Sequence, residues 1–143
     1  MQSIETRKQL TEEWEKRGVK EGQEYSILTA TVVKGTFGLT PSEHKELKGI
    51  AQPSKNLRDH MTPLELIFTA LSEEITRSIA VKEDAQGFNE NHDVAVDGGQ
   101  MAGKFRKETE AKGIEVISKQ NYLKSDKKEE LLDDNNNVNP MSL

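Results

Sequence analysis

Cysteine is absent from the 143 residues, which excludes disulfide bonds and thiolate metal sites and fits the reducing conditions of the cytoplasm. Long apolar runs are absent too. No run approaches the ~18 residues of a membrane-spanning helix, and the polar residues 1–9 do not resemble a signal peptide. The sequence therefore predicts a cytoplasmic protein with no membrane partner.

Aromatic residues are scarce, at 5% of the sequence with a single tryptophan, and hydrophobic residues make up 33%. This content suffices for one domain with a modest core and not for two. We expect a helical domain over residues 1–123, followed by a tail over 124–143. The tail is acidic and then asparagine-rich, so it cannot bury enough apolar surface to become ordered.

Catalytic signatures are missing as well. His44, His60 and His92 are far apart and do not form a His-Glu-x-x-His spacing, and no Gly-Lys-Ser/Thr phosphate loop occurs. Residues 89–93 concentrate polar groups, but neighbours in a helix point in different directions, so we interpret them as a polar face. The sequence predicts a protein that is not an enzyme and that needs no cofactor and no metal.

Positive charge is not in excess, because 20 Lys and Arg residues face 25 Asp and Glu residues, which gives a net charge of −5. Nucleic-acid-binding surfaces normally concentrate basic residues on one face. Only two local clusters occur: Lys45, Lys48, Lys55 and Arg58, and then Lys104, Arg106 and Lys107. We interpret both as solvated faces, with nucleic-acid binding as the alternative.

The strongest pattern that is present predicts a long helix over residues 63–82. Thr62 and Glu65 have the spacing of a capping box around Pro63, which favours the first turn of a helix. Apolar residues then recur at helical spacing: Leu64, Ile67, Phe68, Leu71, Ile75 and Ile79. We expect this stripe to be buried and to be the main source of core stability.

A second long helix is predicted from Phe88 to a stop at Gly113. Its small residues Ala95, Gly99 and Gly103 stand four apart, so a neighbouring backbone can approach closely along that face. Glycines inside a helix are unfavourable, and some gain has to offset that cost. We expect this face to pack on the 63–82 helix, with Leu71 or Phe68 filling the space. The alternative is that the glycines admit a partner chain or a ligand.

Shorter elements precede this hairpin. The sequence predicts helices over residues 3–17 and, from a second Thr-Pro-x-Glu cap, 40–48. Residues 22–35 fit a helical face but include a β-branched run that suits a strand; we favour the helix, since no matching strand is available. The fold class is thus all-α, an antiparallel hairpin of two long helices packed with two or three shorter ones, with a short strand near 114–117.

A polar loop with Asn56, Arg58, Asp59 and His60 comes just before the 63–82 helix. We expect a turn or short helix in which Arg58 and Asp59 pair locally or satisfy open backbone groups. The alternative is that the loop reaches across to the turn at residues 84–88 or to a partner.

Several short motifs together resemble the bacterial DNA damage-inducible protein D family. They are Asn56-Leu57-Arg58-Asp59-His60-Met61-Thr62, Leu64-Glu65-Leu66-Ile67-Phe68, Asp84-Ala85-Gln86-Gly87-Phe88, Gly98-Gly99, Ala102-Gly103, Arg106-Lys107 and Tyr122-Leu123. The similarity spans roughly residues 4–123. It covers the second half of such proteins, without their antirepressor-like N-terminal domain. It implies a role in the SOS response and in modulating recombinase filaments on single-stranded DNA, and it brings no catalytic residues.

We therefore expect a non-enzymatic regulatory or protein-interaction domain whose partner is a recombinase or another DNA-repair factor. The sequence leaves open whether the protein forms homo-oligomers. The candidate interaction residues are Asn56, Arg58, Asp59, His60, Lys104, Arg106 and Lys107. One alternative is a nucleic-acid-binding module that uses residues 45–58, and another is a phage antirepressor-like regulator. A remoter one is an enzyme that uses Arg58, Asp59 and His92.

Overall fold

The computed structural model describes residues 2–50 and 56–122, so the predicted tail and most of the linker before Asn56 lie outside the described residues. The described part is helical and contains no strand, which confirms the all-α class. Its elements are α1 (Gln2–Lys16), α2 (Gln23–Phe37), α3 (Pro41–Leu47), the short 3-10 helix η1 (Leu57–His60), α4 (Pro63–Glu83) and α5 (Gly87–Ala111). None of these helices combines the length and the apolar content needed to cross a bilayer.

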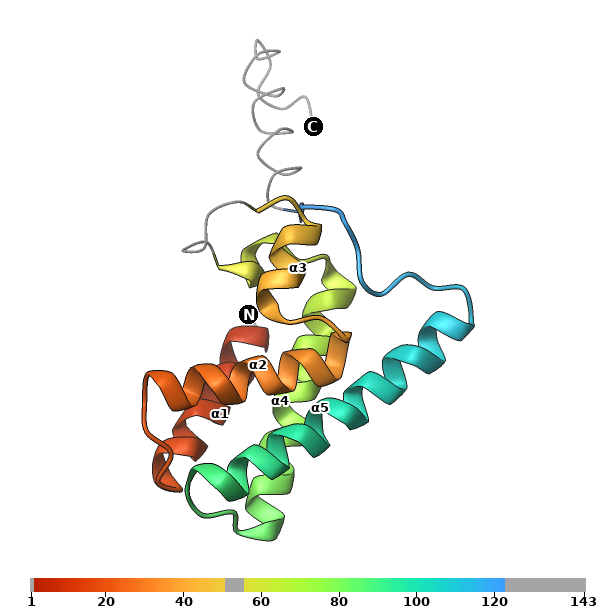
Figure 1. Cartoon of the computed structure of the whole chain (residues 1–143). Helices are drawn as coiled ribbons and strands as arrows, with labels where there is room; N and C mark the ends of the chain where they lie inside the picture. The colour runs from red at the N-terminus through yellow and green to blue at the C-terminus, as the bar shows by residue number, and fades with distance from the viewer. Residues whose placement is uncertain (1, 51–55, 123–143) are drawn as a thin grey trace, which may run out of the picture.

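The two long helices form a hairpin that splays open. Figure 1 shows α5 crossing α4 obliquely and ending as an arm that projects from the body of the fold. The most extensive helix–helix contact is between α2 and α5, followed by those of α4 with α5 and with α1. From the end of α5, residues 112–122 return to the end of the molecule occupied by α3 (Figure 1).

Both predicted helix starts have the complete capping box. The backbone N–H of Glu43 donates to Thr40 Oγ1 at 3.1 Å, and the N–H of Thr40 donates to a carboxylate oxygen of Glu43 at 2.8 Å. Thr62 and Glu65 repeat this arrangement at the start of α4, with distances of 3.3 and 2.9 Å. Local sequence therefore determines where α3 and α4 begin.

Residues 23–37 form a helix in spite of their β-branched run, so the preference for helix over strand is confirmed. The hydroxyls of Thr29, Thr31 and Thr36 each donate to the carbonyl four residues earlier, at 2.7 to 2.8 Å. These bonds satisfy the hydroxyls within the helix itself. Gly38 then ends α2 in the left-handed conformation, with a φ of 74°, which favours glycine.

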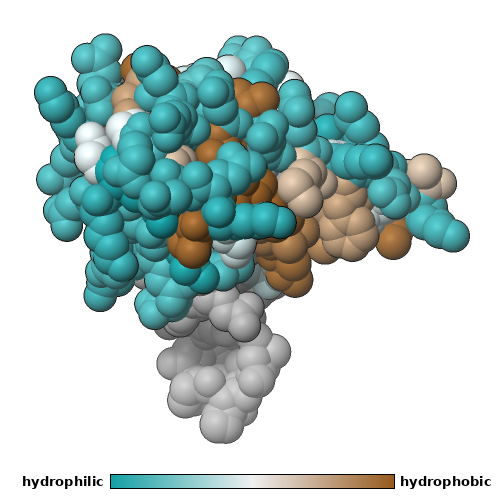
Figure 2. Space-filling model, turned by 90° about the horizontal axis from the view of Figure 1, so that it is seen from below, coloured by the Kyte–Doolittle hydropathy of each residue, from teal (hydrophilic) through white to brown (hydrophobic). Residues whose placement is uncertain are grey.

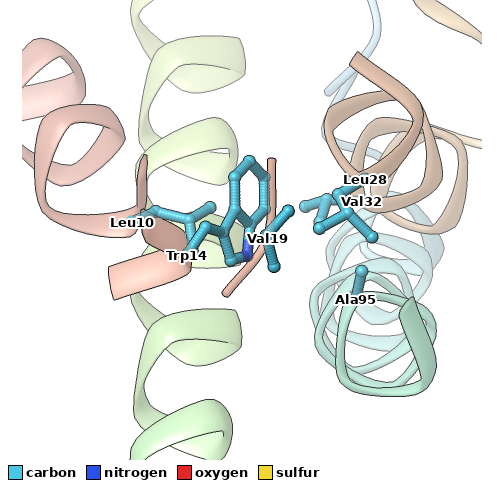
Figure 3. Close-up of a cluster of buried hydrophobic side chains, with 6 residues drawn as sticks. All are labelled: Leu10, Trp14, Val19, Leu28, Val32 and Ala95. Atoms are coloured by element: carbon cyan, nitrogen blue, oxygen red, sulfur yellow. The ribbon is translucent and has the colours of Figure 1, made fainter. Parts of the chain in front are cut away.

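Two main apolar clusters hold the helices together. Figure 3 shows the first, in which side chains of α1, α2 and α5 meet around the fully buried Trp14; its members are Leu10, Trp14, Val19, Leu28, Val32 and Ala95. The second consists of Phe37, Leu57, Met61, Phe68 and Val116. Val116 belongs to the segment predicted as a short strand. That prediction is wrong, because the segment packs its side chains on the helices and pairs with no strand within the described residues.

The small residues of α5 face α2 instead of the expected α4. A Cβ atom added to Gly103 would lie 2.1 Å from the carbonyl oxygen of Gly35, and one added to Gly99 would lie 2.8 Å from that of Val32. Ala95 joins the cluster with Val32. The expected partner helix was wrong, and α2 fills the space that a ligand or a second chain would need. Gly98, next to Gly99, faces α4, where Thr76 lies against it.

The apolar stripe of α4 is not its buried face, which corrects the second packing prediction. Of the six stripe residues only Phe68 is buried; Leu64, Leu71, Ile75 and Ile79 are half-buried and Ile67 is 59% exposed. The buried face carries mostly polar residues: Glu65, Thr69, Ser72, Glu73, Thr76 and Ala80, together with Phe68. Ile67 and Thr76 are two and a half turns apart and so point to opposite sides of α4.

Candidate functional site

Glu65 is the centre of a fully buried polar cluster, which we call the clasp (His44, Lys48, Glu65 and Ser118). Its carboxylate accepts hydrogen bonds from His44 Nε2 at 2.7 Å, from Lys48 Nζ at 2.6 Å and from the backbone N–H of Ser118 at 3.1 Å. Lys48 Nζ also donates to the carbonyl oxygens of Ser118 and Gln120, at 3.0 and 2.7 Å. The clasp therefore joins α3, α4 and the segment that follows α5.

The clasp fixes the ionisation of Glu65. Burial alone would raise the pKa of this carboxyl, but the hydrogen bonds from His44, Lys48 and the backbone of Thr62 and Ser118 outweigh it and lower the pKa from 4.5 to about 2. An ionised carboxylate can only accept hydrogen bonds, so in the bond between His44 and Glu65 the hydrogen is carried by His44 Nε2. The side chains of His44, Lys48 and Glu65 are completely buried, and their hydrogen bonds make the clasp a structural link between α3, α4 and the segment that follows α5.

Some side chains of the predicted polar loop make contacts within the fold, and others are exposed to solvent. Asn56 caps η1 by accepting from the backbone N–H of Arg58 at 3.0 Å, and Asp59 is exposed. His60 is buried, with Nδ1 2.7 Å from Asn121 Oδ1. Arg58 pairs with Glu73 of α4, so the expected pairing with Asp59 was wrong.

Behind Arg58 lies a second polar cluster, at the junction of α1, α2 and α4. The Glu73 carboxylate accepts from the Arg58 guanidinium and, at 2.8 Å, from Thr6 Oγ1. Arg7 Nη1 donates to Thr29 Oγ1 at 2.6 Å, and its guanidinium lies 5.7 Å from the ring centre of Trp14. Arg7 and Arg58 both border a pocket of about 560 Å³, which we call the α1–α3 pocket.

The second predicted basic cluster does not form one surface. Arg106 is buried and donates to the carbonyl oxygen of Thr36 at 2.6 Å and to Glu110 at 2.7 Å, so it fastens α5 to α2. Lys104 and Lys107 are exposed on α5. In the first predicted basic cluster, the side chain of Lys48 is buried in the clasp, where it pairs with Glu65. Lys55 lies outside the described residues.

Metal-ligating side chains do not gather at one place within residues 2–50 and 56–122. No group of three or more His, Asp or Glu side chains there could hold a metal ion. His92 stacks on Phe88 with ring centres 5.7 Å apart, and it borders a groove between α2 and α5. Arg58 and Asp59 lie on η1, beside the α3 end of the fold.

The outer side of the hairpin carries an exposed apolar surface, the α4–α5 face (Ile67, Leu71, Ile75, Met101 and Phe105). Ile67, Met101 and Phe105 are exposed by 59, 55 and 54%. Figure 2 shows apolar side chains gathered in a band that continues onto the arm of α5. Phe105 leans on Phe68, with ring centres 5.6 Å apart, so this face is continuous with the second core cluster.

A groove of about 480 Å³ continues this surface toward the turn of the hairpin. Its lining combines the apolar Ile79 and Met101 with charges of both signs, namely Lys82, Glu83, Asp97 and Lys104. An apolar centre with a charged rim is typical of protein-interaction surfaces.

The sequence did not reveal the buried hydrogen bonds that several residues make. Glu65 was recognised only as a capping residue, while His44 was considered alone and Arg7 and Glu73 were not considered. Their hydrogen bonds to other elements join positions 15 to 67 residues apart, which no local spacing reveals.

The chain matches no protein-family model, no curated protein and no solved structure.

Proposed function

We propose that this protein is a non-enzymatic interaction domain that acts through the α4–α5 face. The observation that carries the proposal is the exposure of Ile67, Met101 and Phe105, each more than half open to solvent on adjoining helices. Apolar side chains gathered on one face of a protein are typical of surfaces that bind another protein. A partner that covers them gains the free energy of burying about half of each side chain.

The partner that the resemblance suggests is a recombinase assembled on single-stranded DNA, or another factor of the bacterial DNA-damage response. The charged rim supports a protein partner, because Lys82, Lys104 and Asp97 can set the orientation of a partner around the apolar centre. The clasp and the packing of α5 on α2 hold the face rigidly, which lowers the entropy lost on binding.

The test is binding to recombinase filaments on single-stranded DNA, measured by co-sedimentation. Phe105→Gln and Ile67→Gln are expected to weaken binding at least tenfold, since each removes an exposed apolar contact. Ile27→Gln is the matched control: Ile27 is 40% exposed, but it borders the groove between α2 and α5. Equal binding by all three variants would contradict the use of the α4–α5 face, and no binding by the unchanged protein would contradict the recombinase partner.

Direct nucleic-acid binding through residues 45–58 is the second candidate. It is supported by the presence of Lys45 and Arg58 beside one pocket. Against it stands the burial of Lys48 in the clasp. Phosphate contacts make affinity fall steeply as salt rises, whereas an apolar protein interface depends little on salt. Single-stranded DNA affinity measured at two salt concentrations, without recombinase, separates these two functions.

A further inference from the structure

The α1–α3 pocket lies on a different side of α4 from the α4–α5 face and takes no part in the interaction proposed for that face. Its walls come from α1, α2, α3, η1 and the start of α4. Its volume of about 560 Å³ falls within the range of small-molecule sites. A small cavity of about 20 Å³, room for roughly one water molecule, continues inward past Arg7 and Arg58 to Ser72 and Glu73.

All the charged side chains among the described residues that line the α1–α3 pocket are positive. Arg7, Lys45 and Arg58 border the pocket from three different elements, and no carboxylate is among the described residues that line it. Glu73 lies beneath, 3% exposed, and is hydrogen-bonded to Arg58 and Thr6. Positive side chains around a concave, partly dry site attract an anion, because the low-dielectric walls focus their field.

Arg7 has a guanidinium group, which can donate hydrogen bonds in fixed directions to an anion. Its hydrogen bond to Thr29 uses one N–H of the guanidinium, whose planar fork suits a phosphate or carboxylate group. Burial, together with repulsion by Arg58, lowers the pKa of Arg7 while Glu73 raises it. An anion in the pocket would offset both the lost hydration and the repulsion between the two guanidinium groups.

The other described residues of the lining are apolar (Val33, Pro41, Leu57 and Met61) or polar and uncharged (Thr29, Asn56 and Thr69), and none of them is aromatic. Val33, Leu57 and Met61 form a hydrophobic wall, with Leu57 and Met61 almost completely buried. Single-stranded nucleic acids are usually held by stacking their bases on aromatic side chains, and no described residue of this lining offers one. The wall instead suits a flexible aliphatic group.

From this combination we infer that the α1–α3 pocket binds a small organic anion, in which a phosphate or carboxylate group is joined to an aliphatic body. Arg7, Lys45 and Arg58 hold the charged group, and Val33, Leu57 and Met61 cover the aliphatic part. The inference is independent of the function proposed for the α4–α5 face.

Four probes test both halves of the inference: hexyl phosphate, hexanoate, inorganic phosphate and 1-hexanol. Trp14 is the only tryptophan and lies against Arg7, so its fluorescence reports binding at this site. We expect hexyl phosphate or hexanoate to bind about tenfold more tightly than inorganic phosphate and than 1-hexanol, because only they use both the charges and the apolar wall. The tighter of the two identifies the charged group of the natural ligand.

Lys45→Gln is the first variant, since it removes a pocket charge without touching the bonds of Glu73. We expect it to weaken binding of the better probe about fivefold. Lys82→Gln removes a lysine beside the hairpin groove and is expected to leave binding unchanged. Arg58→Gln is expected to weaken binding further, with a urea denaturation curve of the same sample showing that it is folded.

Three results would overturn the inference. One is binding of 1-hexanol as tight as that of hexyl phosphate and hexanoate, which would leave no role for the charges. Another is Lys45→Gln binding equal to that of Lys82→Gln. The third is displacement of hexyl phosphate by an oligothymidylate at lower concentration, which would assign the pocket to single-stranded nucleic acid.

Discussion

The two faces of α4 have opposite chemistry and opposite environments. The inner face carries Glu65, Thr69 and Thr76, all buried, and the outer side carries Ile67 and Leu71, which are exposed or half-buried. The inner face can be polar because its groups are satisfied: Thr69 and Thr76 donate to carbonyl oxygens of their own helix at 2.9 and 2.7 Å. Burying hydrogen-bonded hydroxyls costs little, and their small size lets α5 approach closely.

The difference teaches that side-chain size and hydrogen bonding, and not hydropathy alone, decided which side of α4 is buried. The apolar outer side is left for contact with a partner, and the polar inner side holds the fold together. Changes on the inner face should therefore affect stability, whereas changes on the outer face should affect binding.

The largest effect is expected from Glu65→Ala. Removing this carboxylate leaves Lys48 buried without its counter-charge, which typically costs about 3–5 kcal/mol. The measurement is the free energy of unfolding from urea denaturation. Glu74→Ala is the matched control, because the pair of Glu74 and Arg77 is partly exposed and about 0.5 kcal/mol is expected. Equal losses in the two variants would contradict a stabilising clasp.

Acid should reproduce part of that loss without mutation. The pKa of Glu65 is about 2 in the folded protein and near 4.5 when the chain is unfolded, so the unfolded state binds the proton more readily. The stabilisation is complete above about pH 5 and is lost progressively as the pH falls toward 2. Urea midpoints at pH 7, 5, 4 and 3 measure this loss, and Glu65→Gln should flatten the curve. A protein whose pH dependence is the same with Gln at this position would refute the assignment.

Gly98→Ala tests the close approach of α5 to the inner face. The new Cβ would lie 2.1 Å from Thr76 Oγ1 and 2.9 Å from its Cα, so one helix has to shift. We expect a loss of about 1–3 kcal/mol, even though alanine is the better helix former by about 1 kcal/mol. Gln100→Ala, at an exposed position of the same helix, serves as the control. If Gly98→Ala unfolds at a higher temperature than the unchanged protein, the helices are less tightly packed than described.

The smallest effect on stability is expected from Ile67→Gln on the outer face. Surface substitutions away from special contacts usually change the free energy of unfolding by less than about 0.5 kcal/mol. Its consequence should appear in partner binding instead. A loss of stability similar to that of Glu65→Ala would erase the distinction between the two faces.

Local sequence was sufficient to predict the helices and insufficient to predict their packing. The capping boxes at Thr40 and Thr62 placed two helix starts, because every atom involved lies within four residues. The spacing of Ala95, Gly99 and Gly103 indicated close packing but not the partner, since α2 and α4 both offered suitable surfaces. The clasp was not predictable, because a capping glutamate has the same sequence pattern whether it is exposed, as Glu43 is, or buried, as Glu65 is.

The bonds of the clasp also bear on the order of folding. Lys48 meets the carbonyl groups of Ser118 and Gln120 across 70 and 72 residues of sequence, and Glu65 meets Ser118 across 53. Closing such long loops is entropically expensive, so contacts of this kind tend to form after local helices and hairpins. Strengthening them would then lengthen the lifetime of the native state more than it would hasten its formation.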